Sequence, residues 1–388
     1  MKRFFQVAKL NKPVVTMHNS YIRIQYGHKQ TIIKSLAWLK DHSKNYLTSS
    51  GQKVFTSSQC RDATIKEYNI VFDKEWKLVI RWNPLKAHED GIHQVKEESD
   101  TTSEYLLDWL LNSDKELDYL LPKYTLWNNL DIKSLFCTYD EFISTGIKSS
   151  IRTLYDSGLL IVKNCPNNKE TVCKLATQLG PLYNSFYGST WDVKNTSNAV
   201  NVAYTAQELG LHMDLMYFKN PPGIQLLHCI HNSKIGGENM FSDAYKAMID
   251  VKDVKIDNKF VWDILKDVLV TFEYKSDNHW LNYNRPVLKT ANGSIKEVNY
   301  SPPFQGVLFG NQKELSLWYK AMYEFERYLS KNMISYKLNP GETAIFLNNR
   351  IAHGRRTFNG DRHLRGAYVS HCDFLDKYRT LILKSSCK

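Results

Sequence analysis

The stretch LGLHMDLMYFKNPPGIQLLHC, residues 209–229, places a histidine and an aspartate two positions apart, shortly before a Pro-Pro-Gly turn signal. Apolar runs of β type flank the pair, AVNVAYT (199–205) before it and GIQLLHCI (223–230) after it. Residues two apart in a strand point to the same face, so His212 and Asp214 would direct an imidazole and a carboxylate toward one point. The stretch therefore predicts a β-rich fold with part of a metal site at a strand end.

The same His-x-Asp spacing occurs twice more in the chain, and the surroundings of those pairs predict no metal site. His88 and Asp90 lie in a polar, charged segment that we expect to be a surface loop. His371 and Asp373 lie near the C-terminus, past the expected strand end and with no later histidine to act as a third ligand. A bare His-x-Asp match is weak, so the context selects the pair at 212 and 214.

A distant segment supplies the missing groups. The apolar run 343–347 leads to His353, and Arg362 precedes a further strand-like run. Two histidines and one carboxylate form the face that binds Fe(II) and leaves coordination positions open. A guanidinium pairs with a carboxylate through two parallel hydrogen bonds, as the far end of the dicarboxylate 2-oxoglutarate requires. We therefore expect iron on His212, Asp214 and His353, and 2-oxoglutarate on Arg362.

The region from about 200 to 375 consists of short strand-like runs separated by turn signals such as PPG, GGEN, NGS and NPGE. One amphipathic helix is expected at 313–332. Upstream, helices are expected at 140–158 and 169–180, with a buried strand at 159–166 between them. This pattern predicts a mostly β fold with flanking helices, built as a double-sheet barrel or sandwich.

The N-terminal part is expected to form a small β-rich domain over residues 19–125, ahead of a catalytic domain at 133–388. Alternating runs predict strands at 21–26 and 76–82, followed by a loop at 87–103 and a helix at 103–113. The first 18 residues are basic and amphipathic and contain no acid, which is typical of a mitochondrial presequence. We expect a mitochondrial protein, with a cytoplasmic one as the alternative.

The composition argues against two other classes of protein. The formal net charge is +11, but Lys and Arg are spread along the chain and interleaved with acids, so no nucleic-acid partner is expected. No apolar run is long enough to cross a bilayer, so no membrane span is expected. The seven cysteines are scattered without a CxxC motif, which favours a reducing compartment.

Seven linked motifs occur in one order: SFYGSTWDV, NVAYT, LHMD, PPGIQLLHCI, GGEN, HGRR and RHLRGAY. Together they resemble the family of Fe(II)/2-oxoglutarate oxygenases that contains the γ-butyrobetaine and trimethyllysine dioxygenases. The resemblance implies a double-stranded β-helix (jelly-roll) core and a hydroxylation coupled to decarboxylation of 2-oxoglutarate, with ascorbate as reductant. It also implies that His212, Asp214 and His353 hold iron, and that Leu227 lines the 2-oxoglutarate pocket beside Arg362.

The family's substrates carry a trimethylammonium group, which has no N–H donor and is held by aromatic faces. The resemblance implies such a cage here, with a polar neighbour at Asn201. The implied cage residues are Tyr187, Trp191, Tyr204 and Tyr368. The expected partner is therefore a small trimethylammonium acid, first of all γ-butyrobetaine, which the reaction would convert to L-carnitine in carnitine biosynthesis.

Two departures from the family pattern leave alternatives open. The segment WLKDHSKNYLTSS (38–50) lacks the cysteines that hold a structural zinc in relatives, so no zinc is expected. Ser301 stands where a relative offers an asparagine toward the substrate acid, and the turn between His353 and Arg362 is shorter. Trimethyllysine hydroxylation and a catalytically silent relative remain alternatives, and a homodimer is left open.

Overall fold

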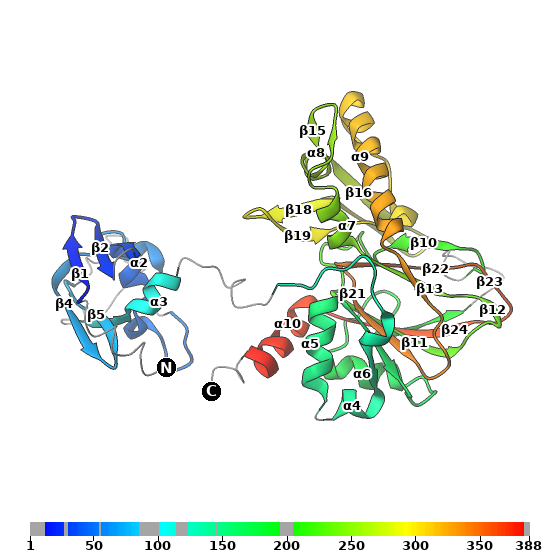
Figure 1. The fold of residues 1–388 in the computed structure, drawn as a ribbon, viewed down its shortest axis with the longest axis horizontal. Helices are drawn as coiled ribbons and strands as arrows, with labels where there is room; N and C mark the ends of the chain where they lie inside the picture. Colours follow the sequence, from blue (N-terminus) through cyan, green and yellow to red (C-terminus); the bar gives the residue numbers. More distant parts are fainter. Residues whose placement is uncertain are drawn as a thin grey trace. The chain divides into compact units, whose positions relative to one another are not determined.

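The computed structural model describes residues 12–26, 30–53, 56–84, 101–113, 123–144, 146–194 and 205–383. The chain divides into two units, Met1–Leu121 and Pro122–Lys388, and each is described by itself. Figure 1 shows the elements of both units along the chain.

The first unit contains two three-stranded antiparallel sheets. One has the order β1-β2-β3 and the other β4-β5-β6. Their strands are β1 (Val14–Met17), β2 (Tyr21–Tyr26), β3 (Gln30–Ser35), β4 (Ile65–Asp73), β5 (Glu75–Trp82) and β6 (Thr102–Leu106). Ile22, Ile24 and Ile32 alternate with exposed residues and belong to one apolar core with Leu78 and Ile80 of β5. The strands expected at 21–26 and 76–82 are therefore confirmed.

The prediction of a helix at 103–113 is confirmed only for its second half. Residues Thr102–Leu106 form β6, which pairs with β5, and the helix α3 covers Leu107–Asn112. Ser103 and Tyr105 are buried while their neighbours are exposed, which is the period of a strand. Most of the loop expected at 87–103, together with His88 and Asp90, lies outside the described residues, as do residues 1–11 of the expected leader. The leader expected over residues 1–18 is too long, because Val14–Met17 form β1 and pair with β2.

The second unit is built on two largely antiparallel sheets whose inner faces line a common pocket. The four-stranded sheet has the order β10-β22-β13-β20, and the six-stranded sheet has the order β7-β8-β21-β11-β24-β9, with one parallel pair, β7 and β8. The strands of the first sheet are β10 (Leu209–His212), β22 (Ile351–Arg355), β13 (Asn239–Asp243) and β20 (Ile334–Tyr336). Those of the second are β7 (Phe136–Thr138), β8 (Leu159–Lys163), β21 (Thr343–Leu347), β11 (Ile224–His231), β24 (His363–Val369) and β9 (Thr190–Lys194).

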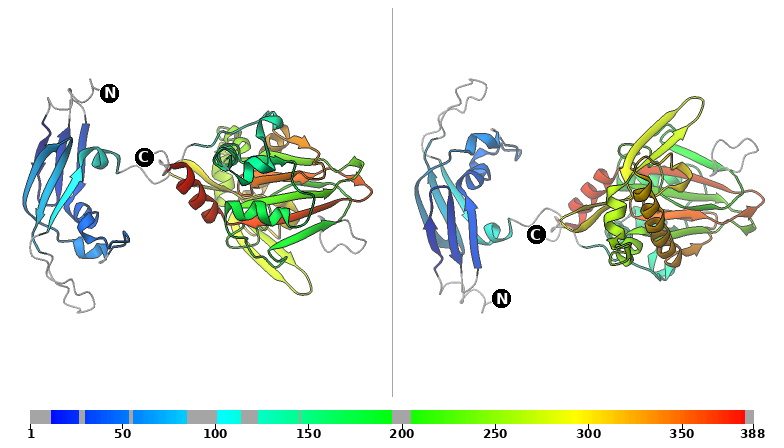
Figure 2. Two further views of the ribbon diagram at one scale, coloured as in Figure 1. Left: turned by 90° about the horizontal axis from the view of Figure 1, so that it is seen from below. Right: turned by 90° about the horizontal axis from the view of Figure 1, so that it is seen from above.

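Figure 2 shows these strands side by side in both of its views. This is the expected double-stranded β-helix with flanking helices, and the strand expected at 343–347 is β21 itself.

Helices pack against both sheets. Of the described helices, three contact the six-stranded sheet: α4 (Tyr139–Ile143), α5 (Ile147–Ser157) and α6 (Thr171–Leu179). A fourth, α10 (His371–Tyr378), packs against α5 and α6. A second group consists of α7 (Ala244–Asp250) and α9 (Gln312–Lys331), which contact the four-stranded sheet, and α8 (Val261–Asp267), which packs against α9. The hairpins β16 (Leu269–Lys275) with β17 (Trp280–Pro286) and β18 (Leu288–Ala291) with β19 (Ser294–Val298) lie between α8 and α9 in sequence.

The helices begin and end largely where the sequence predicts. In α9, Leu315, Trp318, Met322, Phe325 and Leu329 recur every three or four residues and are buried, so the helix presents one apolar face to the core. The helix expected at 140–158 is instead two helices, since α4 ends at Ile143 and α5 begins at Ile147. The described residues contain no helix long and apolar enough to cross a membrane.

Candidate metal centre and adjoining pocket

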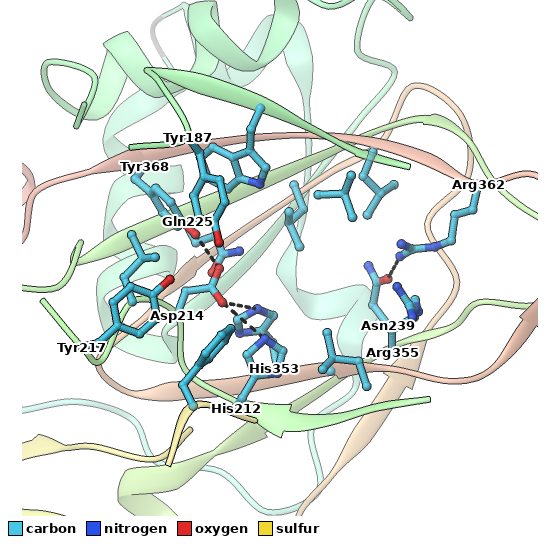
Figure 3. Close-up of a pocket in the computed structure, with 18 residues that line it drawn as sticks. Tyr187, His212, Asp214, Tyr217, Gln225, Asn239, His353, Arg355, Arg362 and Tyr368 are labelled. Carbon is cyan, nitrogen blue, oxygen red and sulfur yellow. Dashed lines mark hydrogen bonds and ion pairs between the residues drawn. The ribbon is translucent and has the colours of Figure 1, made fainter. Parts of the chain in front are cut away.

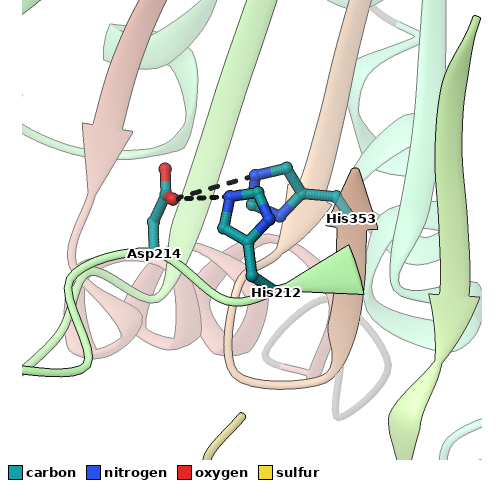
Figure 4. A group of neighbouring side chains, drawn as sticks. All are labelled: His212, Asp214 and His353. Atoms are coloured by element: carbon teal, nitrogen blue, oxygen red, sulfur yellow. Dashed lines mark ion pairs between the residues drawn. The ribbon is translucent and has the colours of Figure 1, made fainter. Parts of the chain in front are cut away.

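The three expected metal ligands come together on two paired strands and the loop that follows one of them. His212 ends β10 and lies directly opposite His353 of β22 in the antiparallel register. Asp214 follows two residues after His212, where the chain has left the strand (Figure 4). One ligand atom from each residue lies within 4.8 Å of the other two. We call His212, Asp214 and His353 the metal triad.

The atoms of the triad converge on one carboxylate oxygen. Asp214 Oδ1 lies 3.3 Å from His212 Nε2 and 3.9 Å from His353 Nε2. His212 Nδ1 is 2.8 Å from the carbonyl oxygen of Gly210. Because a carbonyl only accepts, Nδ1 carries the proton in the neutral ring and Nε2 keeps its lone pair toward the cluster.

The ionisation of the triad suits a divalent metal. Burial raises the pKa of Asp214, but its contacts with His212, His353 and Tyr368 outweigh burial and hold this pKa well below its usual range. Burial lowers the pKa of His353 to about 3, so its imidazole is neutral at physiological pH. A neutral imidazole and an ionised carboxylate are the forms that bind metal. The residues present therefore fit Fe(II), and the described chain contains no second group of this kind.

Asp214 is fixed through its main chain as well. The buried Asn348 side chain accepts a hydrogen bond from Asp214 N at 2.8 Å and donates to Asp214 O at 3.0 Å. The same amide nitrogen donates to Pro222 O at 3.0 Å. Leu215, the next residue, has φ +58°, a left-handed conformation that costs a non-glycine residue about 1 kcal/mol or more. The loop is thus held in a shape that directs the carboxylate toward the two histidines.

The triad opens into a pocket of about 700 Å³, its open mouth included. Figure 3 shows two contrasting ends on either side of the triad. The arginine end contains Arg355, Arg362 and Asn239, and the aromatic box contains Tyr187, Trp191, Tyr217 and Tyr368. Asp214 is the one acidic residue among the described residues that line this pocket.

The arginine end is built to receive an anion. Arg362 is buried and donates to Asn239 Oδ1 at 2.7 Å. Arg362 Nε and Asn239 Nδ2 are buried donors without a hydrogen-bond partner among the described residues. Burial, and next the charge of Arg355, lower the pKa of Arg362 to about 9, so the guanidinium stays charged at neutral pH. Unsatisfied buried donors beside two cations fit a carboxylate of 2-oxoglutarate, and Leu227 lines the same pocket as expected.

The aromatic box offers ring faces. The rings of Trp191 and Tyr368 stack with centroids 4.1 Å apart, and Tyr187 lies 6.3 Å from Trp191. Gly366 lies beneath the indole, since a Cβ there would come within 2.4 Å of the Trp191 ring. Two residues expected beside these rings, Asn201 and Tyr204, lie outside the described residues.

The other His-x-Asp pair within the described chain, His371 and Asp373, lies at the N-terminus of a helix. His371 and Asp373 lie in the first turn of α10, where Ser370 is the N-cap and accepts a hydrogen bond from Asp373 N. Ser370 Oγ also donates to the Asp373 carboxylate at 2.6 Å. This pair lies at the start of a helix and not at the end of a strand, which is where ligands from neighbouring strands could meet.

Five pocket or supporting residues are not found by motif reasoning: Tyr217, Gln225, Asn239, Asn348 and Arg355. Two of them carry a signal that strand periodicity could have found. Gln225 lies two residues before Leu227, and Arg355 two after His353, so each shares a strand face with an expected site residue. Asn239 pairs with Arg355 in the β13–β22 register, which no local pattern reveals.

Comparison with known proteins identifies the family. Residues 137–368, more than half of the chain, match the family described as "Taurine catabolism dioxygenase TauD, TfdA family". Dioxygenase str8 of Strobilurus tenacellus is 35% identical over 269 residues, which span 64% of this chain and 63% of the relative, so the match covers less than two thirds of that protein.

Two further relatives match over nearly the whole chain. Human gamma-butyrobetaine dioxygenase is 26% identical over 385 residues, covering 92% of each protein. The mitochondrial trimethyllysine dioxygenase of Rattus norvegicus is 27% identical over 386 residues, covering 94% of this chain and 86% of the relative. The resemblance predicted from the motifs is confirmed, and the chain belongs to the TauD, TfdA family of dioxygenases.

Proposed function

We propose that this dioxygenase is an Fe(II)- and 2-oxoglutarate-dependent hydroxylase of a trimethylammonium carboxylic acid, first of all γ-butyrobetaine, which it would convert to L-carnitine. The observation that carries the proposal is the placement of the metal triad between a buried guanidinium pair and a box of aromatic rings in one pocket (Figure 3). The similarity to gamma-butyrobetaine dioxygenase over 92% of the chain supports it.

Each part of the pocket has a role in this proposal. His212, Asp214 and His353 would hold Fe(II), and Arg362 with Asn239 would bind the far carboxylate of 2-oxoglutarate beside Leu227. With both bound, the site would supply oxygen activation: one oxygen atom of O₂ enters the substrate C–H bond while 2-oxoglutarate becomes succinate and CO₂. The chain itself binds and orients both molecules, which brings the reacting C–H bond close to the metal.

The aromatic box would select the cation. A trimethylammonium group has no N–H to donate, so it gains little from hydrogen-bond acceptors and is attracted to the faces of Trp191, Tyr187 and Tyr368. Asn201 and Tyr204 would complete the box.

The test uses purified protein with Fe(II), 2-oxoglutarate and ascorbate as reductant. We expect succinate release to rise when γ-butyrobetaine is added, and mass spectrometry to show a product heavier by one oxygen atom. Trimethyllysine in a parallel reaction tests the second candidate, which its dioxygenase relative supports at similar identity and coverage. A silent family member would bind Fe(II) but release no additional succinate with either compound.

The cellular setting is also a proposal. The basic, acid-free leader over residues 1–11 and the mitochondrial name of the trimethyllysine dioxygenase relative support import into mitochondria. A fluorescent fusion of the whole chain should colocalise with mitochondria, and deletion of residues 2–11, which spares β1, should leave it in the cytoplasm. Sedimentation of the purified protein would decide between a monomer and a homodimer. Metal analysis would test the expectation that no structural zinc is bound.

A further inference from the structure

Tyr368 contacts both the aromatic box and the metal triad. Its ring stacks on Trp191, and its hydroxyl donates a hydrogen bond to Asp214 Oδ2 at 2.6 Å (Figure 3). We propose that Tyr368 is a positioning residue that couples the two: its hydroxyl holds Asp214 for the metal while its ring forms a wall of the box, so that occupation of one site changes the affinity of the other. The inference rests on the proposed function, because it takes the triad as the metal site and the box as the cation site.

The two oxygens of Asp214 have different surroundings. Oδ1 is the oxygen near His212 Nε2 and His353 Nε2, at 3.3 and 3.9 Å. Oδ2 accepts the Tyr368 hydroxyl. A carboxylate with one oxygen occupied in this way presents the other to a metal as a single ligand atom. Hydrogen bonds to ligating carboxylates orient them and tune their affinity for the metal.

The hydroxyl of Tyr368 controls the freedom that Asp214 retains. Asn348 fixes the main chain of Asp214 at both its N–H and its C=O. The carboxylate can still rotate about its side-chain bonds, and the hydrogen bond from Tyr368 opposes that rotation. Removal of this one hydroxyl would therefore loosen the carboxylate and leave a buried oxygen unsatisfied, without changing the backbone.

The ring of Tyr368 transmits the coupling. It is 2% exposed and lies on β24, between β11, which carries Gln225, and β9, which carries Trp191. A cation against the box contacts this ring, while the hydroxyl at its far end holds the carboxylate. Any preference of the cation for the metal-bound form must be matched by an equal preference of the metal for the cation-bound form.

The experiment measures Co(II) binding to the purified full-length protein without oxygen, by its visible absorption, in the wild type and in Tyr368→Phe. Tyr245→Phe is the matched control, because Tyr245 is also buried and its hydroxyl donates a hydrogen bond to Lys296 O at 2.8 Å, outside the pocket lining. We expect Tyr368→Phe to weaken Co(II) binding about 10- to 100-fold and Tyr245→Phe to leave it unchanged. Equal Co(II) affinity in the wild type and Tyr368→Phe, or an equal loss in both variants, would overturn the proposal.

A second measurement tests the coupling in the wild type alone. Tetramethylammonium chloride, with sodium chloride at equal ionic strength as the control, should change the Co(II) affinity and its visible spectrum. The change should persist in Tyr245→Phe and be smaller in Tyr368→Phe. If tetramethylammonium has no effect on Co(II) binding in the wild type, the proposed coupling is overturned, even if Tyr368→Phe fails to fold. The proposed function fails by a different result, which is the lack of substrate-stimulated succinate release.

Discussion

In the proposed function, the arginine end and the aromatic box of the pocket would bind their ligands by different physics. The arginine end would bind through a few directional contacts from the buried Arg362 and Asn239, whose guanidinium nitrogen and Oδ1 lie 2.7 Å apart. The aromatic box spreads its attraction over several ring faces that need no aligned donor. Loss of one group should therefore cost much at the arginine end and less at the box. The following variants test this difference, and the first removes what both ends share.

Asp214→Ala should abolish turnover while both ends of the pocket stay intact. The variant removes the single carboxylate of the metal triad, and we expect at least about a thousandfold loss, or about 4 kcal/mol of transition-state stabilisation. Succinate release and Co(II) absorption measure the loss. Asp90→Ala is the control, since it removes the aspartate of another His-x-Asp motif and should keep full activity. Substantial turnover in Asp214→Ala would contradict the assignment of the triad.

Arg362→Ala should raise the KM for 2-oxoglutarate about 10- to 100-fold, because charge-assisted hydrogen bonds contribute about 1.5–3 kcal/mol. At saturating 2-oxoglutarate most of kcat should return, since the variant removes binding energy and leaves the metal triad in place. Arg356→Ala is the control, because Arg356 is exposed and paired with Glu208. An unchanged KM for 2-oxoglutarate in Arg362→Ala would show that the cosubstrate does not bind at the arginine end.

Trp191→Leu should raise the KM for the trimethylammonium acid about 2- to 30-fold, since one cation–π contact contributes about 0.5–2 kcal/mol. The KM for 2-oxoglutarate should not change, which separates the two ends. The neutral tert-butyl analogue of γ-butyrobetaine provides the control, because it has the same shape without the charge. Its binding should be weak in the wild type and little altered by the substitution. A large effect on the analogue would show that the box recognises shape alone.

Asp192→Asn should give the smallest effect, a loss of at most about 1 kcal/mol of stability. Asp192 lies next to Trp191 on β9 and contacts His363 at 2.6 Å and Arg365 at 2.9 Å. Burial raises its pKa, but the hydrogen bonds from His363 and Arg365 outweigh burial and lower the pKa to about 2. Its ionised form therefore stabilises the fold above about pH 4, and this contribution is lost as the pH falls toward 2.

Urea denaturation at several pH values measures this last effect. The difference in unfolding free energy between the wild type and Asp192→Asn should be full at neutral pH and shrink below about pH 4. A difference that grew on acidification would contradict the role of Asp192 as an ionised anchor of β9.

Much of the site follows from the sequence because its groups occur in short motifs. The His-x-Asp pair, His353 and Arg362 could be predicted, since strand periodicity fixes which residues share a face and the linked motifs fix their order. Tyr217 and Asn348 could not be predicted in the same way. Both act through long-range contacts, such as the pairing of Asn348 with Asp214, 134 positions apart in the chain.

The errors in the fold arise from local patterns that tertiary contacts override. SEYLL reads as the start of a helix, yet pairing with β5 draws Thr102–Leu106 into a strand. The break between α4 and α5 falls at Gly146, where a Cβ would come 2.8 Å from the Glu141 carbonyl oxygen. The helical pattern on both sides concealed this crowding.

The pairing of β10 with β22 has a consequence for how the metal site responds to loss of its ion. Two of the three ligands lie opposite each other on hydrogen-bonded strands, so the spacing of the imidazoles is maintained by the barrel wall. Only the carboxylate lies on a loop. Chelation should therefore leave the histidine pair in place, while the contacts of Asp214 with Asn348 and Tyr368 keep the carboxylate close to it, so that reloading requires no refolding.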